Sequence, residues 1–421
     1  SVLMEVRVSP VAEGGVHVRT SGGALLVGVT PAQLSYNPNS ADFTTHGVIR
    51  INESLGTQSN LEPMLMGGQI RGLLDVRDKD LAGLAEALGG FAAALGDALN
   101  EVHNENASYP AVSQMTGRQT GLLGADALGF SGEATVGVVD AGGVLRDRLS
   151  IDFDAMTITA EAPAGTFSFA GGTIADFVSA LNSALNASSP SGSASFSGGV
   201  LSINMSNGGG AVIQQSATDP SDRGGRGFSH FFGLNDVVSR PTPMFFETGS
   251  SGSDVHGLAA GGSITYQVRD SAGRFVAERT IKISGALAAP GATWDDLLAE
   301  LNASGTGLGG YGSFGMDANT GQVTFSPGAA YTVNLIADST IRGDTGVSFT
   351  ALNGLSKAAT AGRALEVNVE PRVASDPSRL AVGRPDLTAD IGDRVVEAGD
   401  NRGSTALAAA RDSTRSFSAS G

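Results

Sequence analysis

The chain has 421 residues, of which 41% are hydrophobic, 16% are charged and 60 are glycine. Single cores stop growing at roughly 250–300 residues, so we expect more than one domain, rich in turns and small side chains. The net charge of −16 argues against nucleic acid as a partner, because phosphate binding needs clustered Lys and Arg, and the absence of cysteine excludes disulfides and thiolate chemistry.

The first 60 residues alternate apolar and polar side chains in short segments separated by glycine-rich turns. "MEVRVSP", "GVHVRT", "ALLVGV" and "GVIRINE" are typical of strands, and together they predict a small antiparallel sheet. The chain contains no run of about 18 or more apolar residues, so we expect no membrane span and no membrane partner. The opening "SVLMEVRVSP" lacks the features of a signal peptide and starts inside a strand pattern, so we expect a fragment of a longer protein.

A long helix is predicted near residues 67–107. Apolar residues recur there at intervals of three and four, with Arg77 interrupting the series: Leu74, Leu81, Leu84, Leu88, Phe91, Leu95, Ala98 and Val102. This spacing is typical of the seam of a coiled coil or helix bundle, although an ordinary core helix would show it too. Small residues flank the seam and would allow neighbouring helices to approach closely: Ala85, Gly89, Ala92, Ala93 and Gly96. A helix of forty residues is roughly 60 Å long, which suits a rod more than a compact domain.

The middle of the chain contains an internal duplication. Thr173 and Asp176 correspond to Thr293 and Asp296 at a constant offset of 120 residues. Each copy predicts a hairpin that turns at "DAGG" or "DSAG", a helix capped by Thr173 or Thr293, and a second hairpin that turns at "SGG" or "NTG". We interpret Phe177 and Trp294 as core residues of these copies, with a ligand platform as the alternative.

The C-terminal segment repeats the pattern of the first part of the chain, in which a strand precedes a helix. "ALEVNVEPRV" predicts a strand, and "GDNRGSTALAAARDSTRSF" predicts a helix with Leu407, Ala410 and Thr414 on one side. If the strand joins the opening sheet and the helix packs beside the long helix, the two ends of the chain form one domain. We therefore predict an α+β multidomain fold with an elongated rod domain (1–120 and 356–421) that contains the long helix, the returning C-terminal helix and a small antiparallel sheet. Two duplicated β-rich α+β modules (125–240 and 250–355) would be inserted in it.

No motif in the sequence indicates chemistry, so we predict no catalytic, cofactor-binding or metal-binding residue and no enzyme. The histidines are scattered: His17, His46, His103, His230 and His256. "DVRDKD" (75–80) lacks the order of a calcium loop, and "GTGLGG" (305–310) follows a helix where a dinucleotide fingerprint must follow a strand. Paired carboxylates in a cleft would be needed for an enzyme. The alternative function is a surface adhesin or carbohydrate-binding protein built on the duplicated β-rich modules, which would need exposed aromatics, and Tyr266, Tyr311 and Tyr331 are few.

Three motifs resemble the FlgK family, the hook-associated proteins at the junction of flagellar hook and filament. They are "GGQIRGLLDVRD" (67–78), similar to the family's GG-x-L-x-G-L-L-x-x-R-D, "LNEVH" (99–103), similar to its N-x-x-H helix end, and "GDNRG" (399–403) before an Ala- and Leu-rich helix. The resemblance covers about the first 120 and last 50 residues.

The resemblance implies a structural subunit of the extracellular bacterial flagellum, exported through the type III pathway without cleavage. It would self-associate in a ring, with flagellar hook protein, a second junction protein or flagellin, and an export chaperone as partners. In that family long terminal helices form a coiled-coil inner tube, and we expect them to be missing here. We expect the long helix to lie along the tube axis with its seam on the returning segment. Leu61, Met64, Leu65 and Met66 are candidate subunit contacts, with ordinary packing as the alternative.

Overall fold

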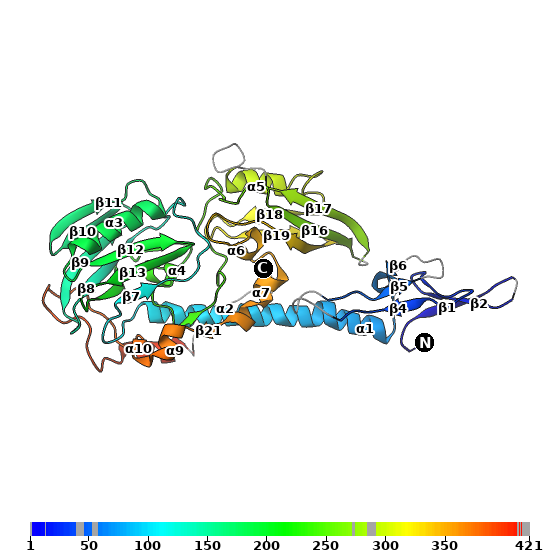
Figure 1. The fold of residues 1–421 in the computed structure, drawn as a ribbon, viewed down its shortest axis with the longest axis horizontal. Coiled ribbons are helices and arrows are strands. Elements are labelled where there is room, and N and C mark those ends of the chain that lie inside the picture. Colours follow the sequence, from blue (N-terminus) through cyan, green and yellow to red (C-terminus); the bar gives the residue numbers. More distant parts are fainter. Residues whose placement is uncertain are drawn as a thin grey trace.

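One long helix runs along the side of an elongated molecule, with sheets and shorter helices beside it (Figure 1). This computed structural model describes residues 2–12, 14–38, 46–52, 58–271, 274–283, 292–410, 412 and 414. The helix begins as α1 (Gln69–Asp75), passes through a π-helical turn, η2 (Val76–Asp80), and continues as α2 (Leu81–Asn104). The predicted long helix is therefore present, and "DVRDKD" lies inside it.

Two small antiparallel sheets lie at the N-terminal end of the long helix (Figure 1). The first has the order β1 (Val6–Pro10), β2 (Val16–Thr20), β3 (Leu25–Val27), and the second has the order β4 (Gln33–Ser35), β5 (Arg50–Asn52), β6 (Gln58–Asn60). A 3-10 turn, η1 (Glu62–Met64), leads to the helix. Ile51, Leu61, Leu65 and Leu74 are buried together with Ala24. The single sheet predicted for this region is thus two sheets, because its short strands pair in two separate groups.

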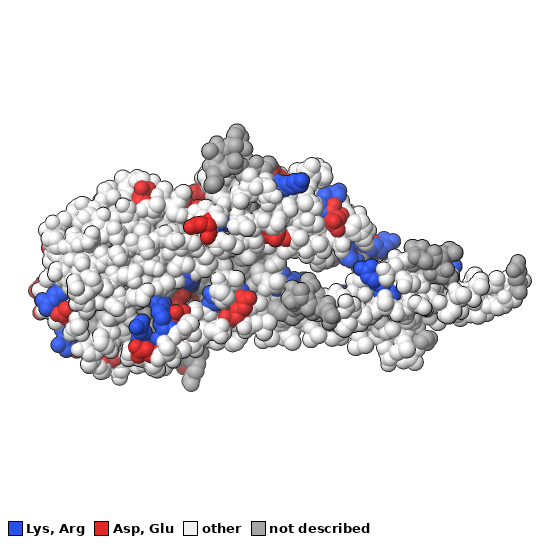
Figure 2. Space-filling model, in the orientation of Figure 1, with Lys and Arg blue, Asp and Glu red and all other residues white. Residues whose placement is uncertain are grey.

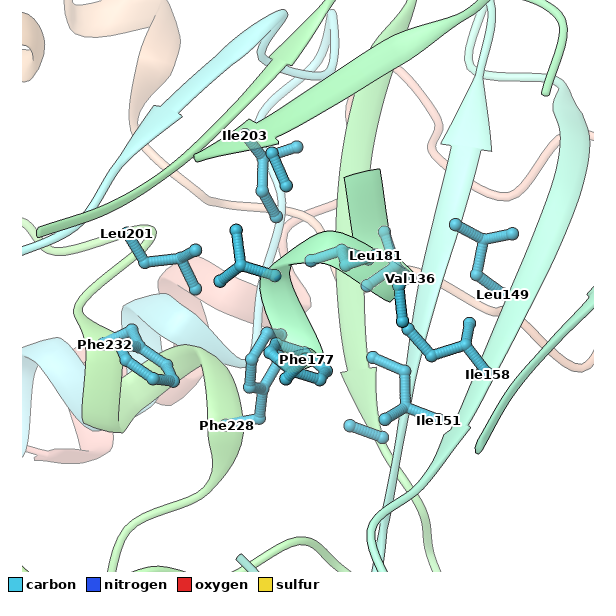
Figure 3. Close-up of a cluster of buried hydrophobic side chains, with 14 of the residues drawn as sticks. Val136, Leu149, Ile151, Ile158, Phe177, Leu181, Leu201, Ile203, Phe228 and Phe232 are labelled. Atoms are coloured by element: carbon cyan, nitrogen blue, oxygen red, sulfur yellow. The ribbon is translucent and has the colours of Figure 1, made fainter. Parts of the chain in front are cut away.

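A five-stranded antiparallel sheet forms the centre of residues 125–240, which we call the first inserted segment. Its order is β11 (Ala164–Ser168), β10 (Thr157–Glu161), β9 (Leu145–Asp152), β8 (Glu133–Val139), β14 (Gly210–Gln215). Phe177 and Leu181 of α3 (Ile174–Ala187) lie among strand side chains such as Val136, Ile151 and Ile158 (Figure 3). The remaining elements are a second sheet of order β12 (Gly192–Ser197), β13 (Val200–Met205), β7 (Gln114–Thr116), and then α4 (Phe228–Phe232) and β15 (Val238–Ser239).

A three-stranded antiparallel sheet forms the centre of residues 250–355, which we call the second inserted segment. Its order is β17 (Phe275–Lys282), β16 (Ser263–Asp270), β20 (Tyr331–Asp338). The other elements are α5 (Trp294–Leu301), the hairpin of β18 (Gly312–Met316) and β19 (Val323–Pro327), and α6 (Phe349–Leu352). Trp294, Leu297 and Leu301 on α5 are buried in this segment's core.

The two inserted segments contain the local features that the sequence predicts. Thr173 and Thr293 cap α3 and α5, and each exchanges hydrogen bonds with an aspartate three residues on, which makes a capping box in both helices. One hairpin precedes each helix and another follows it. Phe177 and Trp294 are buried, as predicted for core residues. Residues 272–273 of the "DSAG" turn lie outside the described residues, and "GTGLGG" lies in the loop after α5.

Two buried arginines tie the first inserted segment to the chain that follows it, Arg342 from the second segment and Arg223 through Thr248 between the segments. Arg342 donates hydrogen bonds to both carboxylate oxygens of Asp126, at 2.7 and 2.9 Å, and its side chain is 1% exposed. Arg223 donates to the carbonyl oxygens of Ala127 and Thr248, at 2.7 and 3.1 Å. A buried charge is costly without its partner, so these contacts hold the two segments in one arrangement.

The returning segment consists of short helices and loops, and the prediction of a strand for "ALEVNVEPRV" is wrong except for two residues. It forms α7 (Lys357–Ala361), α8 (Arg363–Glu366), β21 (Asn368–Val369), α9 (Pro371–Ser375) and the 3-10 turn η3 (Pro377–Arg379). β21 pairs with β15 and not with the opening sheets. The strand is short because Pro371, which cannot donate to a ladder, starts the next helix. The last helix, α10 (Arg402–Ala410), packs against α2 as predicted, and residues 411, 413 and 415–417 of the predicted helix lie outside the described residues.

Between α9 and α10 the chain covers the outer face of the five-stranded sheet. Leu387, Val395 and Val396 pack on apolar strand side chains that include Val139 and Leu145. Arg148 of β9 also donates to the carbonyl oxygen of Leu387 at 2.7 Å. The returning segment therefore contacts the first inserted segment between its two contacts with the long helix, which are made by α7 and α8 and then by α10.

Candidate assembly surface

One face of the long helix carries a row of large apolar side chains that the described residues leave exposed. Their exposed fractions lie between 42% and 69%, and they are Leu73, Val76, Leu81, Leu84, Leu88, Phe91 and Leu95. Contiguous exposed apolar patches on soluble proteins mark interaction sites, whereas single exposed apolar residues do not. We call these seven residues the seam, and it is the candidate functional surface of this protein.

The prediction that the seam packs on the returning segment is wrong for these residues, because the small-residue face of the helix packs there instead. α7 and α8 contact α2 on that face. A Cβ atom on Gly89 would lie 2.0 Å from the carbonyl oxygen of Thr360, and one on Gly96 would lie 3.3 Å from Met244 Sδ. Ala93, which lies between these two glycines in the sequence, is also buried. The predicted close approach at small residues is confirmed, and it leaves the larger side chains facing outwards.

The motif at the start of the long helix attaches it to the N-terminal sheets. Gly68 has a φ of +92°, and a Cβ atom there would lie 2.6 Å from the Cα atom of Met4. Leu74 is buried in the core of this end of the molecule. Arg77 donates to Glu62 Oε2 at 3.2 Å. The glycine, the leucine and the arginine of this motif therefore have structural roles.

The N-x-x-H motif attaches the other end of the helix to the inserted segment and to the returning chain. Asn100 donates to the carbonyl oxygen of Val238 at 2.8 Å and accepts from its backbone N–H at 2.9 Å, so it takes the place of a neighbouring strand. His103 Nε2 accepts a hydrogen bond from the backbone N–H of Ala381 at 2.8 Å, and Nδ1 contacts the carbonyl oxygen of Asn235 at 2.5 Å. Burial lowers the pKa of His103 below its ordinary value, so the imidazole is neutral and Nδ1 donates.

A buried polar group beside this motif was not predicted from the sequence. Asn104 donates to Asp236 Oδ1 at 2.8 Å, and the same oxygen accepts from Arg118 at 2.7 Å. Asn100 and Asn104 lie one turn apart on the same side of the helix, and that spacing is the signal that could have indicated a buried polar contact.

The "GDNRG" motif closes the neck of the loop that covers the first inserted segment. Asp400 Oδ2 accepts from the backbone N–H of Arg384 at 2.9 Å, and Arg402 donates to the carbonyl oxygen of Arg384 at 2.7 Å. Gly403 lies so close to Val382 that a Cβ atom would come within 2.7 Å of its backbone. The motif thus sets where α10 begins, next to the C-terminal end of the long helix.

The sequence candidates for other functions find little support in the described residues. The part of the chain that the structure describes contains no group of three His, Asp or Glu residues suited to hold a metal ion. Tyr266 is buried, and Tyr311 and Tyr331 pack edge to face with ring centroids 5.2 Å apart, so these three do not form an open aromatic surface for carbohydrate.

Of the two alternatives for the apolar residues before the long helix, ordinary packing holds for all but Met66. Leu61 and Leu65 are 1% and 2% exposed and belong to the core of the N-terminal sheets. Met64 is half-buried against that core, and Met66 is exposed. Sequence alone could not separate these positions, because all four side chains are apolar and lie in one short segment.

By length and apolar composition, the helix from Gln69 to Asn104 could cross a membrane. We predict no span because the apolar residues are not continuous, and the core helix of a soluble protein passes the same test. Here one face of the helix packs on protein and its end carries the buried polar side chains of Asn100 and His103. Charged side chains are scattered over the visible face of the molecule, which shows no continuous basic patch (Figure 2).

The comparisons with known proteins concern the region that contains the N-terminal sheets and the seam. A family model described as "Flagellar hook-associated protein FlgK helical domain" matches residues 1–114. Over 105 residues the chain is 36% identical to "Flagellar hook-associated protein 1" of Salmonella typhimurium (strain LT2) and to the protein of the same name of Salmonella typhi. Residues 1–114 therefore match the FlgK family.

The match of the chain to these Salmonella relatives is partial. It covers 24% of this chain and 19% of each relative, so it spans about a fifth of the length of those proteins. A solved structure, that of the flagellar hook junction protein FlgK from Burkholderia pseudomallei, is 13% identical, with coverage of 86% of this chain and 70% of that one and a TM-score of 0.22. The motifs at 67–78 and 99–103 lie inside the region that the FlgK family model matches, and "GDNRG" lies outside it.

Proposed function

We propose that this chain is a structural subunit of the bacterial flagellum that joins hook to filament. The observation that carries this proposal is the seam: seven large apolar side chains in one row on a long helix, exposed in the described structure. A row with this spacing fits against another helix, because a repeat of about 3.5 residues keeps apolar side chains facing a helical partner. The family match supports a hook-associated protein, and the seam supplies a surface for assembly.

In this proposal the subunit works outside the cell, after export with a chaperone, and has no enzymatic activity. It self-associates in a ring, contacts the flagellar hook protein on one side, and contacts a second junction protein or flagellin on the other. Neither nucleic acid nor a membrane is a partner. Each contact in such a ring can be weak, because many repeated contacts add as avidity.

We also propose that the chain is divided into a rod domain and two duplicated modules. The rod domain comprises residues 1–120 and 356–421, and the modules comprise residues 125–240 and 250–355. Separate apolar cores in the two inserted segments and the equivalent capping boxes of Thr173 and Thr293 support this division. In this arrangement the rod carries the contacts between subunits, and the modules project outwards and stiffen the collar.

The test replaces seam residues by charged ones in the complete protein. Leu88→Glu with Phe91→Glu places two carboxylates in the seam without disturbing the packed face. A strain that lacks its own FlgK gene and receives this variant should assemble few attached filaments and swim poorly. The control is Val29→Glu, because Val29 is an exposed apolar residue outside the seam, at 99% exposure. Circular dichroism of both purified variants verifies folding, and normal swimming of the folded seam variant would refute the proposal.

A further inference from the structure

The π-helical turn η2 lies between the part of the helix that packs on the N-terminal sheets and the part that carries most of the seam. The backbone N–H of Leu81 donates to the carbonyl oxygen of Val76, five residues earlier. An α-helix would make this bond to the residue four positions earlier, so the turn holds one extra residue. Since each residue of an α-helix advances about 100° around the axis, the extra residue changes the phase of everything beyond it by about that angle.

The exposure of the side chains on either side of the turn agrees with this change of phase. In an uninterrupted α-helix, Leu74 and Leu81 would face nearly the same way, because seven residues make almost two turns. Here Leu74 is 6% exposed and lies in the core of the N-terminal sheets, whereas Leu81 is 56% exposed. The residue that continues the seam upstream of the turn is instead Leu73, at 69% exposure.

Counting the π-turn as one α-turn makes the seam regular along its whole length. The steps between the seven seam residues, from Leu73 to Leu95, are three, five, three, four, three and four residues. The step of five, from Val76 to Leu81, spans η2, and removing its extra residue leaves alternating steps of three and four. This alternation is the a/d spacing of a coiled coil, and it extends over about 30 Å of helix at 1.5 Å per residue.

The residues beside the seam limit the kind of partner that fits. The flanking positions next to Leu84, Leu88 and Phe91 are alanines: Ala85, Ala87, Ala92 and Ala94. Coiled coils often carry charged residues at such positions, where ion pairs select the partner. Small uncharged flanks instead favour a close approach by an apolar helix. Towards the C-terminal end of the same helix, Ala98 is already buried and α10 packs against α2, so a helix of this chain already occupies the neighbouring surface.

We propose that η2 adjusts the phase of the helix so that it serves two contacts at once. Leu74 and Arg77 turn towards the N-terminal sheets, while Leu73 and Val76 join the seam and lengthen it for a single apolar partner helix. The identity of the surface as a docking site rests on the proposed function, whereas the phase role rests on the fold alone. If the present residues between Leu74 and Leu81 formed a regular α-helix, one of the two contacts would have to rotate away by about 100°.

The test is a matched pair of variants at the π-turn, deletion of Lys79 and insertion of one alanine after Lys79. Deletion removes the extra residue, so the turn can become α-helical while both faces keep their phase. Lys79 is suitable because its side chain is 67% exposed and pairs with Asp75, itself 37% exposed. Insertion adds a second extra residue and rotates the two faces apart. We expect the melting temperature to stay within about 2 °C on deletion and to fall by more than about 5 °C on insertion.

Cysteine labelling reports the phase directly, because the chain has no cysteine of its own. In the parent protein and in the deletion variant, Leu73→Cys should react at least about tenfold faster with a thiol reagent than Leu74→Cys, since reaction at a buried site requires local opening. Both sites precede the insertion, so a smaller difference in the insertion variant would show that the contact with the N-terminal sheets has rotated away, and an unchanged difference with a lower melting temperature would show that the downstream contact has. A deletion as harmful as the insertion, or an insertion without effect on stability and labelling, would overturn the phase proposal.

The complete protein separates this inference from the proposed function. In the motility assay, the deletion variant should assemble filaments like the parent protein, and the insertion variant should not. If the labelling pattern is as expected but the doubly charged seam variant swims normally, the partner helix is wrong and the phase role stands. If deletion abolishes the labelling pattern, the phase role is wrong whatever the motility.

Discussion

Replacement of Gly89 by alanine should destabilise the protein, although alanine is the better helix former. In a helix interior this replacement normally gains about 1 kcal/mol. At Gly89, however, the new Cβ atom would lie 2.0 Å from the carbonyl oxygen of Thr360 and 3.0 Å from its carbonyl carbon. Both are backbone atoms, so no side-chain rotation relieves the clash and α2 must move away from α7. Overpacking costs about 1–3 kcal/mol and more where the backbone must shift, so we expect a net loss of about 1–2 kcal/mol in the free energy of unfolding.

The matched control for this prediction is Gly83→Ala in the same helix. A Cβ atom there has no other atom within 4 Å, so the replacement should stabilise the protein by about 0.5–1 kcal/mol. Urea unfolding followed by circular dichroism compares the variants. Hydrogen exchange of the α2 amides localises the effect, because a chain with several cores need not unfold in one step. The reasoning is refuted if Gly89→Ala is as stable as Gly83→Ala.

Two further predictions concern buried charge. His103 is buried, and its pKa in the folded protein lies below the ordinary 6.5. As the pH falls below about 6.5, the unfolded chain therefore binds a proton at His103 before the folded protein does. The free energy of unfolding should fall until the pH has passed the lowered pKa of the folded protein. Urea midpoints should therefore decline more steeply between about pH 7 and pH 5 for the parent protein than for His103→Gln, and equal slopes would contradict this role. Asp126→Asn removes the carboxylate that pairs with the buried side chain of Arg342 and should lower the free energy of unfolding by about 3–5 kcal/mol. Glu161→Gln, at a pair whose glutamate is 42% exposed, should cost under about 1 kcal/mol, and equal losses in urea unfolding would refute the distinction.

Features that depend on neighbouring residues in the chain were predictable from the sequence. The capping boxes of Thr173 and Thr293 were predicted because the cap and its aspartate are only three residues apart. The hairpins were predicted for the same reason, since a turn depends on a few adjacent residues. The motifs "GGQIRGLLDVRD" and "LNEVH" indicated the FlgK family, but their structural roles became visible only in contacts with Met4 and Ala381. Those partners are far from the motifs in the sequence.

The segment after residue 362 was mispredicted for a related reason. "ALEVNVEPRV" alternates like a strand, but a strand also needs a neighbour along its whole length. The neighbour that it finds, β15, is only two residues long. The pattern therefore described a possible strand, and tertiary structure decided that most of the segment is helical.

The sequence by itself determined that a long helix with two different faces lies in a β-rich chain. It showed large apolar residues on one face and glycine and alanine beside them. Only the tertiary structure decided which face is buried, because that choice depends on how closely the backbone at Thr360 approaches Gly89. Tertiary packing also accounts for the π-turn, because the bond from Leu81 to Val76 accompanies a Leu74 buried in one core and a Leu81 that faces outwards. The periodicity of the sequence shows which faces of the helix are apolar enough to be buried, and contacts with distant residues determine which of these faces is buried.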